Sequence, residues 1–211
     1  MVPTANANGT STITVTLSDG SLTDVDTFVQ TVVAVNDVPT GGNDSVNGTE
    51  DTDYDFATGD FTYSDVETPT IQGVKVITLP GAGELYVDSD NDGIVDFGES
   101  VDEDQVVTDI DKFKFKPAAN VNGTPYTTYT FQVYDGTTTS SSTYTMTINI
   151  AAVNDAPVIS DIANQSTNED TTESNVAFTI SDVETSVACN ATYVTATSSN
   201  TSLISNGNIT I

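Results

Sequence analysis

The sequence predicts an all-β chain built from tandem antiparallel β-sandwich repeats, with one complete domain flanked by two partial domains. Three observations support this prediction. The pentapeptide VNDVP at residues 35–39 returns as VNDAP at residues 153–157, and the two prolines lie 118 residues apart, the size of one all-β domain. Short stretches alternate apolar and polar residues with a period of two, and Gly, Asn and Asp turn signals separate them. No stretch of any length has a helical period.

The repeated pentapeptide is predicted to link successive domains. Its proline cannot donate to a β-ladder and keeps the preceding residue extended. The Asn and Asp before the proline offer short oxygen ligands at the point where one domain follows another. The order of the motifs then predicts the C-terminal half of a domain at residues 1–36, a complete domain at residues 37–156 and the N-terminal half of a domain at residues 157–211.

A hairpin is predicted in the first partial domain. Residues 11–18 read STITVTLS, which places Ile13, Val15 and Leu17 on one face of a half-buried strand. Asp19-Gly20 turns the chain, and residues 28–35 supply the second strand.

The same hairpin is predicted again in the complete domain. Residues 117–124 (PAANVNGT) echo residues 3–10 (PTANANGT), and Asp135-Gly136 echoes the earlier Asp-Gly turn. The two strands of this second hairpin are expected at residues 129–133 and 144–150.

Alternating apolar residues mark further strands of the complete domain. They are Val74, Val76, Leu85, Val87, Phe113 and Phe115. Lys112, Lys114 and Lys116 alternate with the two phenylalanines, so we expect the lysines to face water and the rings to face the core.

Charge is the most unusual property of the composition. The sequence has 31 acidic residues, four lysines and no histidine, for a formal net charge of −27. A compact chain with this charge repels itself unless cations bind or the charge is spread over an elongated shape. Phosphate-backbone partners are therefore excluded, and no nucleic acid is expected. No apolar run approaches the roughly 20 residues that cross a bilayer, and residues 1–4 lack signal-peptide features, so we expect a soluble chain without membrane insertion.

The most specific motif is DSDNDGIVDFGE at residues 88–99, which we call the acidic loop. It matches the EF-hand calcium loop at every ligand position and has glycine at the sharp turn. The predicted Ca2+ ligands are Asp88, Asp90, Asp92, Ile94 through its carbonyl, Asp96 and Glu99. Residues 84–87 read as a strand and residues 100–104 as no helix, so the loop is predicted to be a staple between strands and not a sensor. The alternative, a solvated loop without metal, would leave five carboxylates uncompensated.

Five motifs together resemble the bacterial cadherin-like tandem repeats of large surface adhesins. They are the linker, the Glu-Asp and Asp-Val-Glu-Thr motifs after each linker, the PAANVNGT run and the Asp-Gly turn, and they cover nearly the whole chain. The resemblance implies that acidic residues of adjoining domains bind Ca2+ at each junction. Matched by motif, the ligands would be Asn36, Asp37, Glu50, Asp51, Asp65 and Glu67 at one junction and Asn154, Asp155, Glu169, Asp170, Asp182 and Glu184 at the other. Asp19 and Asp135 of the Asp-Gly turns are weaker additions, because Asp and Asn at such places also bond their own turns without metal.

The resemblance implies a structural function: a calcium-rigidified extender repeat of an extracellular adhesin or surface fibre on a bacterial cell. The partial domains would be completed head-to-tail by neighbouring copies or repeats of the same protein, as in a filament. No enzymatic activity is expected. The sequence lacks the histidine and arginine that nucleophilic triads and phosphoryl transfer need, and no base accompanies the single cysteine. Two alternatives stay open. One is a ligand- or carbohydrate-binding module, which a cluster of exposed aromatic residues would favour, and the other is an accessory domain of a larger secreted enzyme.

The single cysteine, Cys189, excludes a disulfide within the chain and is expected to be a small packed side chain. Asn-x-Ser/Thr triplets begin at Asn8, Asn122 and Asn190, among other places, and are expected to be mostly coincidental in so Asn- and Thr-rich a chain.

Overall fold

The computed structural model describes residues 1–185 and 193–211, so the predictions for Cys189 and Asn190 fall outside the described residues. The chain divides into two units, Met1–Ala151 and Ala152–Ile211. The described residues form β-strands, irregular segments and three short 3-10 turns, Thr58–Asp60 (η1), Ile110–Lys112 (η2) and Asn206–Asn208 (η3). The all-β prediction is therefore confirmed for the described chain. Within it, no helix is long and apolar enough to span a membrane.

The first unit begins with the hairpin of β1 (Gly9–Ser18) and β2 (Thr23–Val32). Asp19 Oδ1 accepts hydrogen bonds from the backbone N–H groups of Ser21 and Leu22, both at 2.8 Å, and so closes the turn between the strands. The second strand was predicted five residues too late, because its first half is polar and shows no apolar alternation.

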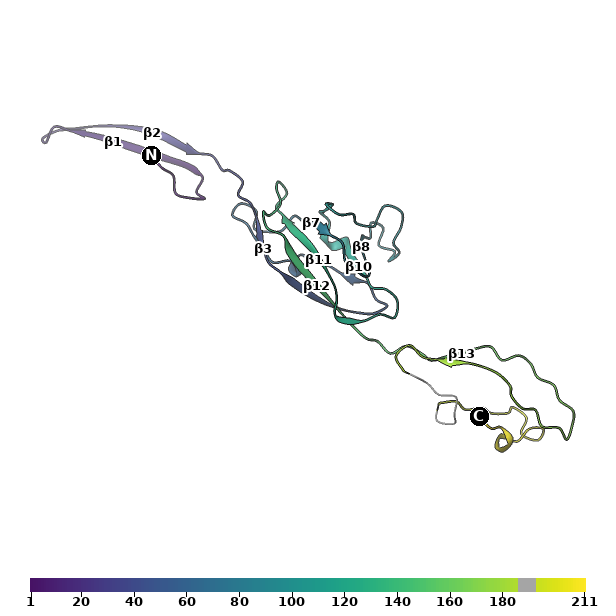
Figure 1. Cartoon of the computed structure of the whole chain (residues 1–211). Helices are drawn as coiled ribbons and strands as arrows, with labels where there is room; N and C mark the ends of the chain where they lie inside the picture. The colour runs from purple at the N-terminus through teal and green to yellow at the C-terminus, as the bar shows by residue number, and fades with distance from the viewer. Residues whose placement is uncertain (186–192) are drawn as a thin grey trace. The chain divides into compact units, whose positions relative to one another are not determined.

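Two sheets enclose the core of the first unit (Figure 1). The five-stranded sheet has the order β4 (Asp44–Thr49), β12 (Tyr144–Ala151), β11 (Gly123–Tyr134), β7 (Gly73–Thr78) and β9 (Val106–Val107). The three-stranded sheet has the order β5 (Tyr54–Asp55), β10 (Phe113–Lys116) and β8 (Glu84–Val87). The short strands β3 (Thr40–Gly41) and β6 (Tyr63–Ser64) pair with each other.

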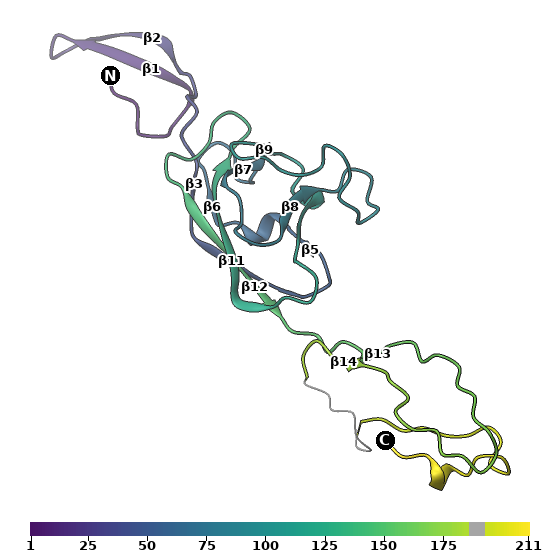
Figure 2. The ribbon, with the colours of Figure 1, turned by 45° about the vertical axis from the view of Figure 1, so that its right-hand side comes forward.

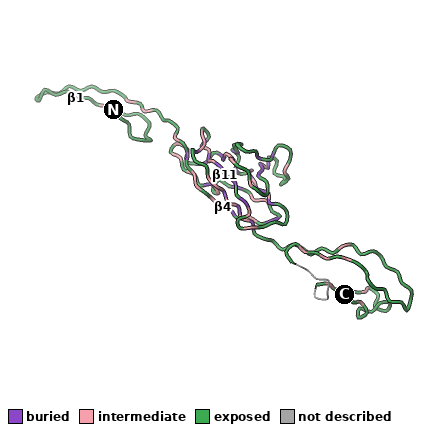
Figure 3. The backbone as a smooth tube through the Cα atoms, viewed as in Figure 1, coloured by how far each residue is buried: buried purple, intermediate pink, exposed green. Residues whose placement is uncertain are grey.

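Aromatic rings join the two sheets across the core. Phe56, directly after β5, and Phe113 of β10 each meet Tyr129 of β11 edge-on, with ring centroids 6.1 and 6.5 Å apart. Each such pair adds about 0.5–1.5 kcal/mol beyond the burial of its area. Figure 3 shows that the buried residues gather in this part of the chain, and every described residue classed as buried lies within residues 39–150.

The large sheet is mixed, which corrects the prediction of purely antiparallel pairing. β4 runs parallel to β12, from Met146 opposite Asp44 to Ala151 opposite Thr49. The reason is topological. β4 follows the first linker and β12 precedes the second, so both strands run from the end of the sheet where the chain enters to the end where it leaves. We call these the leading end and the trailing end.

The two hairpins of the first unit share one register. Ile13 lies opposite Phe28 in β1–β2, and Tyr129 lies opposite Met146 in β11–β12, at the positions that the linker and Asp-Gly motifs align. The agreement holds at the other end of each hairpin, where the aligned pairs are Gly9 with Val32 and Gly123 with Ile150. Two residues extra in β11, between Gly123 and Tyr129, are taken up by a bulge. The sequence echo is thus also a structural repeat.

The second unit repeats the start of the complete domain. Its strands β13 (Val158–Ile159) and β14 (Ile180–Ser181) pair as β3 and β6 do, with Val158 opposite Ser181 where the first copy has Thr40 opposite Ser64 (Figure 2). No residue in the described part of this unit is buried.

The face of β1 that was predicted to be half-buried lies largely open to solvent. Val15 is 53% exposed and Leu17 is 73% exposed. In the aligned positions of β11, Phe131 and Val133 are fully buried. The difference arises because the three-stranded sheet packs over β11, whereas no second layer packs over β1 in the first unit.

Candidate metal sites

The acidic loop leaves the three-stranded sheet at the end of β8 and is closed at its base. The N–H of Val87 donates to the carbonyl of Glu99 at 2.9 Å, and the N–H of Asp88 donates to the carbonyl of Lys112 at 2.9 Å. The predicted strand before the loop is observed as β8, and after the loop Ser100 makes a single bridge to Tyr86 instead of starting a helix. The loop is therefore anchored to the sheet at both ends.

Five carboxylates converge within the acidic loop. Oxygen atoms of Asp88, Asp90 and Glu99 lie within 4.8 Å of one another, and so do those of Asp90, Asp92 and Asp96. Asp90 belongs to both groups, so it stands between the two halves of the loop.

The turn of the loop follows from its glycine and its first aspartate. Gly93 has φ +75°, a conformation that favours glycine. The carboxylate of Asp88 is fully buried and accepts hydrogen bonds from the N–H groups of Asp92 at 3.1 Å and Gly93 at 3.2 Å. Glu99, which is 7% exposed, accepts from the N–H of Ser89 at 2.7 Å and from that of Asp96 at 3.1 Å. Asp88 and Glu99, the first and last predicted ligands, are thus held in place by backbone N–H groups of the loop itself.

Charge repulsion is concentrated at Asp96. The charge of Asp92, then burial, then the charges of Asp90 and Glu99 raise the pKa of Asp96. At Glu99 the balance is opposite, because hydrogen bonds from the Ser89 hydroxyl and the Asp96 and Ser89 N–H groups lower its pKa. The loop therefore combines Glu99, whose charged form is stabilised by hydrogen bonds, with Asp96, whose charged form is destabilised by neighbouring carboxylates.

Two lysines of the β10 region hold the acidic loop, which corrects the prediction that they face water. Lys114 Nζ lies 3.0 Å from Asp88 Oδ2 and 3.0 Å from Asp55 Oδ1, and its side chain is only 18% exposed. Lys112 donates to the carbonyl of Ser89. Burial acts to raise the pKa of Asp88, but the hydrogen bond and charge of Lys114 outweigh it, together with backbone N–H groups, and lower that pKa. The alternation was predicted correctly, but the acidic loop contacts Lys112 and Lys114 on the outer side, so these two lysines are only partly exposed.

The residues of the acidic loop fit a calcium ion by donor chemistry. All of the donors are oxygen atoms, carboxylates predominate, and their spacing allows several to reach one ion, which suits a hard cation of high coordination number. Lys114 already neutralises part of the charge on Asp88. A cation would therefore compete with this ammonium for one of its ligands.

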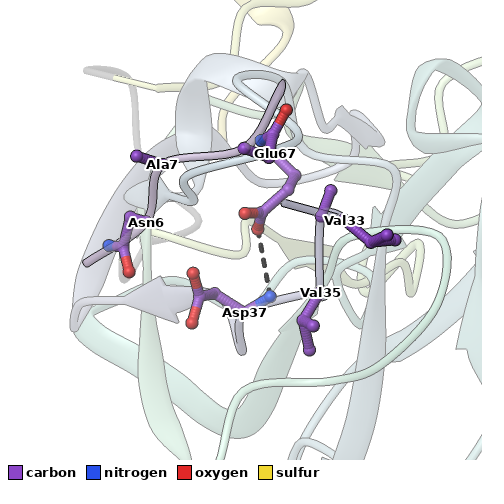
Figure 4. Close-up of a pocket in the computed structure, with 8 residues that line it drawn as sticks. Asn6, Ala7, Val33, Val35, Asp37 and Glu67 are labelled. Atoms are coloured by element: carbon purple, nitrogen blue, oxygen red, sulfur yellow. Dashed lines mark hydrogen bonds between the residues drawn. The ribbon is translucent and has the colours of Figure 1, made fainter. Parts of the chain in front are cut away.

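A second group of oxygen donors surrounds the first linker at the leading end. We call it the leading-end cluster, and it consists of Asn36, Asp37, Asp65, Glu67 and Asp135. The N–H of Asp37 donates to Glu67 Oε2 at 3.0 Å (Figure 4). Asn36 Nδ2 donates to Asp135 Oδ2 at 2.9 Å, and Asp65 Oδ1 accepts from the N–H of Glu67 at 3.0 Å. The structure thus brings four predicted ligands together with Asp135, the weaker addition.

The leading-end cluster contains unsatisfied buried oxygen atoms. Asp65 Oδ2 and the Tyr63 hydroxyl are buried and have no hydrogen-bond partner among the described residues. Burial, with the charges of Asp65 and Asp135, raises the pKa of Tyr63 to about 12. An orphaned carboxylate oxygen is costly inside a protein unless a donor or a cation reaches it. This oxygen is the observation that fits a cation at the cluster, although among the described residues groups of three carboxylates within 4.8 Å of one another occur in the acidic loop and not here.

A pocket opens beside the leading-end cluster. Asp37 and Glu67 line it from the linker side, and Asn6 and Asn8, from the run before β1, line it as well (Figure 4). The two asparagines were not among the predicted ligands. A signal for them was present in the sequence, because they belong to the PTANANGT run that is repeated as PAANVNGT.

The structure separates Glu50 and Asp51 from the leading-end cluster, which corrects their assignment to one junction with Asp37. The N–H of Glu50 donates to the carbonyl of Ala151 at 3.0 Å, at the trailing end of the sheet. β11 joins the two ends and has 12 residues, which span about 40 Å. Glu50 and Asp51 directly follow β4. Asp65 and Glu67 follow β6, which pairs with β3 and so brings the chain back to the leading end.

At the trailing end, the repeated asparagine run meets the acidic residues. Asn120 donates its backbone N–H to Asp51 Oδ1 at 2.9 Å, and Asn122 Nδ2 donates to Glu50 Oε2 at 3.3 Å. Glu50 is 1% exposed, so this amide is one of the groups that satisfy a buried carboxylate. Asn120 and Asn122 are aligned with Asn6 and Asn8 of the first hairpin.

The second linker repeats the hydrogen bonds of the first. The N–H of Asp155 donates to Glu184 Oε2 at 3.0 Å, and Asn154 Nδ2 donates to the carbonyl of Asp155 at 2.8 Å, as Asn36 does to Asp37 at 2.8 Å. The first linker has the same Asp-to-Glu bond at the same length.

The remaining predicted ligands of the second unit fall in two places. Asp182 Oδ1 accepts from the Thr185 N–H and hydroxyl, and these bonds lower the pKa of Asp182. Glu169 and Asp170 form an exposed turn in which Asp170 has φ 59°, the value that Asp51 also has. The linker bond and the backbone turn after the Glu-Asp pair thus recur in the second unit, whereas Glu50 is buried and Glu169 is exposed.

Comparison of the chain with known protein families, with curated proteins and with solved structures finds no match.

Proposed function

We propose that this chain is a calcium-stabilised β-sandwich repeat that extends an adhesin or surface fibre outside a bacterial cell. The observation that supports this most directly is the linker geometry, which is built twice with the same hydrogen bonds: Asp37 to Glu67 and Asp155 to Glu184, each at 3.0 Å. A catalytic or ligand-binding site needs to be built once, whereas a spacer gains length by repeating its joints.

Calcium is the proposed stabiliser because the negative charge is collected at oxygen-rich places. The acidic loop offers five carboxylates, and the leading-end cluster offers an orphaned Asp65 oxygen. The chain as a whole carries a formal charge of −27, which divalent cations would reduce. When bound, the ion would supply positive charge and direct coordination. The oxygen atoms of the acidic loop and of the leading-end cluster would hold it.

The described chain offers no observation that favours a carbohydrate- or protein-binding module. The aromatic residues that are exposed in the described chain are Phe28, Phe97 and Tyr193, which come from β2, the acidic loop and the second unit. They do not belong to one set of neighbouring loops, as an aromatic binding platform would require.

Calorimetric calcium titration and thermal unfolding before and after chelation test the proposal. At calcium 100-fold above its dissociation constant, one site stabilises the fold by about 2.7 kcal/mol. Glu99→Gln should remove the response of the acidic loop and Asp65→Asn that of the leading-end cluster, while Glu103→Gln, an exposed residue outside both, is the control for loss of one charge. An unchanged melting curve after chelation would contradict calcium stabilisation.

A further inference from the structure

The hairpin β1–β2 has a strand edge that its copy in the complete domain does not leave open. In β11–β12, the outer edge of β12 carries β4 along a six-residue parallel ladder. In the described structure β2 pairs only with β1, so the equivalent edge has no strand beside it. A two-stranded hairpin with an open edge and an exposed apolar face is marginally stable in water and prone to pair.

The chain contains a second copy of the segment that covers this edge. Glu50 and Asp51 directly follow β4, and Glu169 and Asp170 directly follow residues 163–168. Asp51 and Asp170 both have φ 59°, so the backbone turns alike after both segments. Residues 163–168 form no strand in the described structure and are all exposed. They are therefore available to pair.

One pair of positions has changed together between the two copies. In the complete domain, Ile148 of β12 lies opposite Val46 of β4, and the two residues are 0% and 3% exposed. The aligned positions are Gln30 in β2 and Gln165 in the free segment. An apolar pair has thus become an amide pair, and two facing amides can donate to and accept from each other. A single glutamine opposite an apolar side chain would have no such hydrogen-bond partner across the strands.

The exposed area supports the same conclusion. The chain exposes 13808 Å². A compact protein of its mass, 22.1 kDa, exposes about 9,300 Å², and two separate compact units of the same total mass about 11,000 Å². The excess of roughly 2,500–4,500 Å² lies in the range that permanent protein interfaces bury.

We infer that the edge of β2 binds residues 163–168 of a second copy of this chain as a parallel strand, with Gln165 beside Gln30. The second copy repeats the contact at its own β2, so the interaction is head-to-tail and propagates instead of closing. The inference rests on the repeat relationship, which the proposed function shares, and it does not require calcium.

Electrostatics oppose this association and make its salt dependence informative. All four lysines lie within residues 75–116, so residues 1–36 and 157–211 contain acidic residues without any lysine or arginine. Like-charged surfaces repel less when salt screens them, with a Debye length near 10 Å at 0.1 M. Association should therefore strengthen as sodium chloride rises, unlike association that oppositely charged patches drive.

Disulfide trapping between two different variants tests the register. Gln30→Cys and Gln165→Cys are made in separate chains that also carry Cys189→Ser, then mixed and mildly oxidised. The mixture should give a cross-linked heterodimer in several-fold higher yield than Thr31→Cys mixed with Gln165→Cys, because residue 31 points to the other face of β2. Equal yields would overturn the register, and a strictly monomeric mass at all concentrations and salt levels would overturn the association.

Closure within one chain is the competing outcome. A single chain carrying both Gln30→Cys and Gln165→Cys should form little internal disulfide when diluted, and an internal disulfide in high yield would overturn pairing between copies. Repeating the mixing experiment with a chelator separates the two proposals. Cross-linking that persists without calcium supports the interface even where the calcium titration fails, and calcium stabilisation without cross-linking leaves the proposed function intact while removing the interface.

Discussion

Glu67 Oε2 accepts a hydrogen bond from the backbone N–H of Asp37 at 3.0 Å, and this bond fastens the first linker to the loop that follows β6. The linker has no β-ladder of its own, so its backbone groups depend on such side-chain partners. The Asn36 amide, which bonds both the Asp37 carbonyl and Asp135, is the other partner. The joint is thus held by side chains and is open to single-residue tests.

Replacing Glu67 by Ala should loosen the first linker alone. The Asp37 N–H loses its acceptor, so its hydrogen exchange should accelerate and the first unit should lose about 1 kcal/mol of unfolding free energy. Hydrogen exchange resolved to single amides measures this. Glu184→Ala is the matched control, because it should accelerate exchange at Asp155 and leave Asp37 unchanged. Unaltered exchange at Asp37 in Glu67→Ala would refute the role of this bond.

Replacing Lys114 by Met should tighten calcium binding at the acidic loop. Without the ammonium, the ion no longer displaces a charge-assisted hydrogen bond from Asp88, so the dissociation constant should fall by about tenfold or more. Without calcium the same variant should melt at a lower temperature than the wild type, because buried Asp88 has lost its cationic partner.

Lys116→Met is the control for this change, since Lys116 lies on the same strand and makes no ion pair among the described residues. Calorimetric titration and thermal unfolding of both variants provide the comparison. Equal calcium affinities in Lys114→Met and wild type would show that the ammonium and the ion do not compete.

Aligned positions in the two hairpins should respond differently to truncation. Phe131→Ala removes a fully buried ring that contacts Phe61, and it should lower the unfolding free energy by about 3–5 kcal/mol. Val15→Ala, at the aligned position of β1, should cost within about 0.5 kcal/mol in dilute solution, because Val15 is 53% exposed. Urea unfolding at low protein concentration measures both. A large loss for Val15→Ala under these conditions would mean that β1 is covered within the monomer.

Alkaline pH should destabilise the first unit through the partly buried Tyr54. Burial, then the charge and hydrogen bond of Asp60, raise the pKa of Tyr54 to about 12. A raised pKa means that the folded state prefers the neutral phenol. The contribution of Tyr54 is therefore complete below the unfolded pKa, near 10, and is lost as pH rises through about 12. Stability measured between these pH values should fall less steeply in Tyr54→Phe, and identical pH profiles for variant and wild type would contradict this assignment.

The sequence determined the all-β class, the repeat and the positions of seven of the fourteen strands of the described chain. These depend on local patterns: alternation brings Phe131 and Val133 to one face, an Asp-Gly pair sets the turn at Asp135, and a proline directly precedes the first strand after each linker. The acidic loop is equally local, because all of its donors lie within twelve successive residues. Such local features can be predicted from the sequence because residues that are close in the chain are also close in space.

The tertiary structure alone decided which distant groups meet. Glu50 and Glu67 lie in one stretch of sequence, yet the course of β4 carries Glu50 to the trailing end while the return of the chain leaves Glu67 at the leading end. Lys114 alternates like a solvent-facing residue, but the acidic loop folds back onto it and gives it Asp88. Neither outcome follows from periodicity, because strand direction and loop placement depend on the packing of the whole sheet. For the same reason the face of β1 has an apolar pattern but remains exposed, since burial requires a second layer that β1 by itself cannot supply.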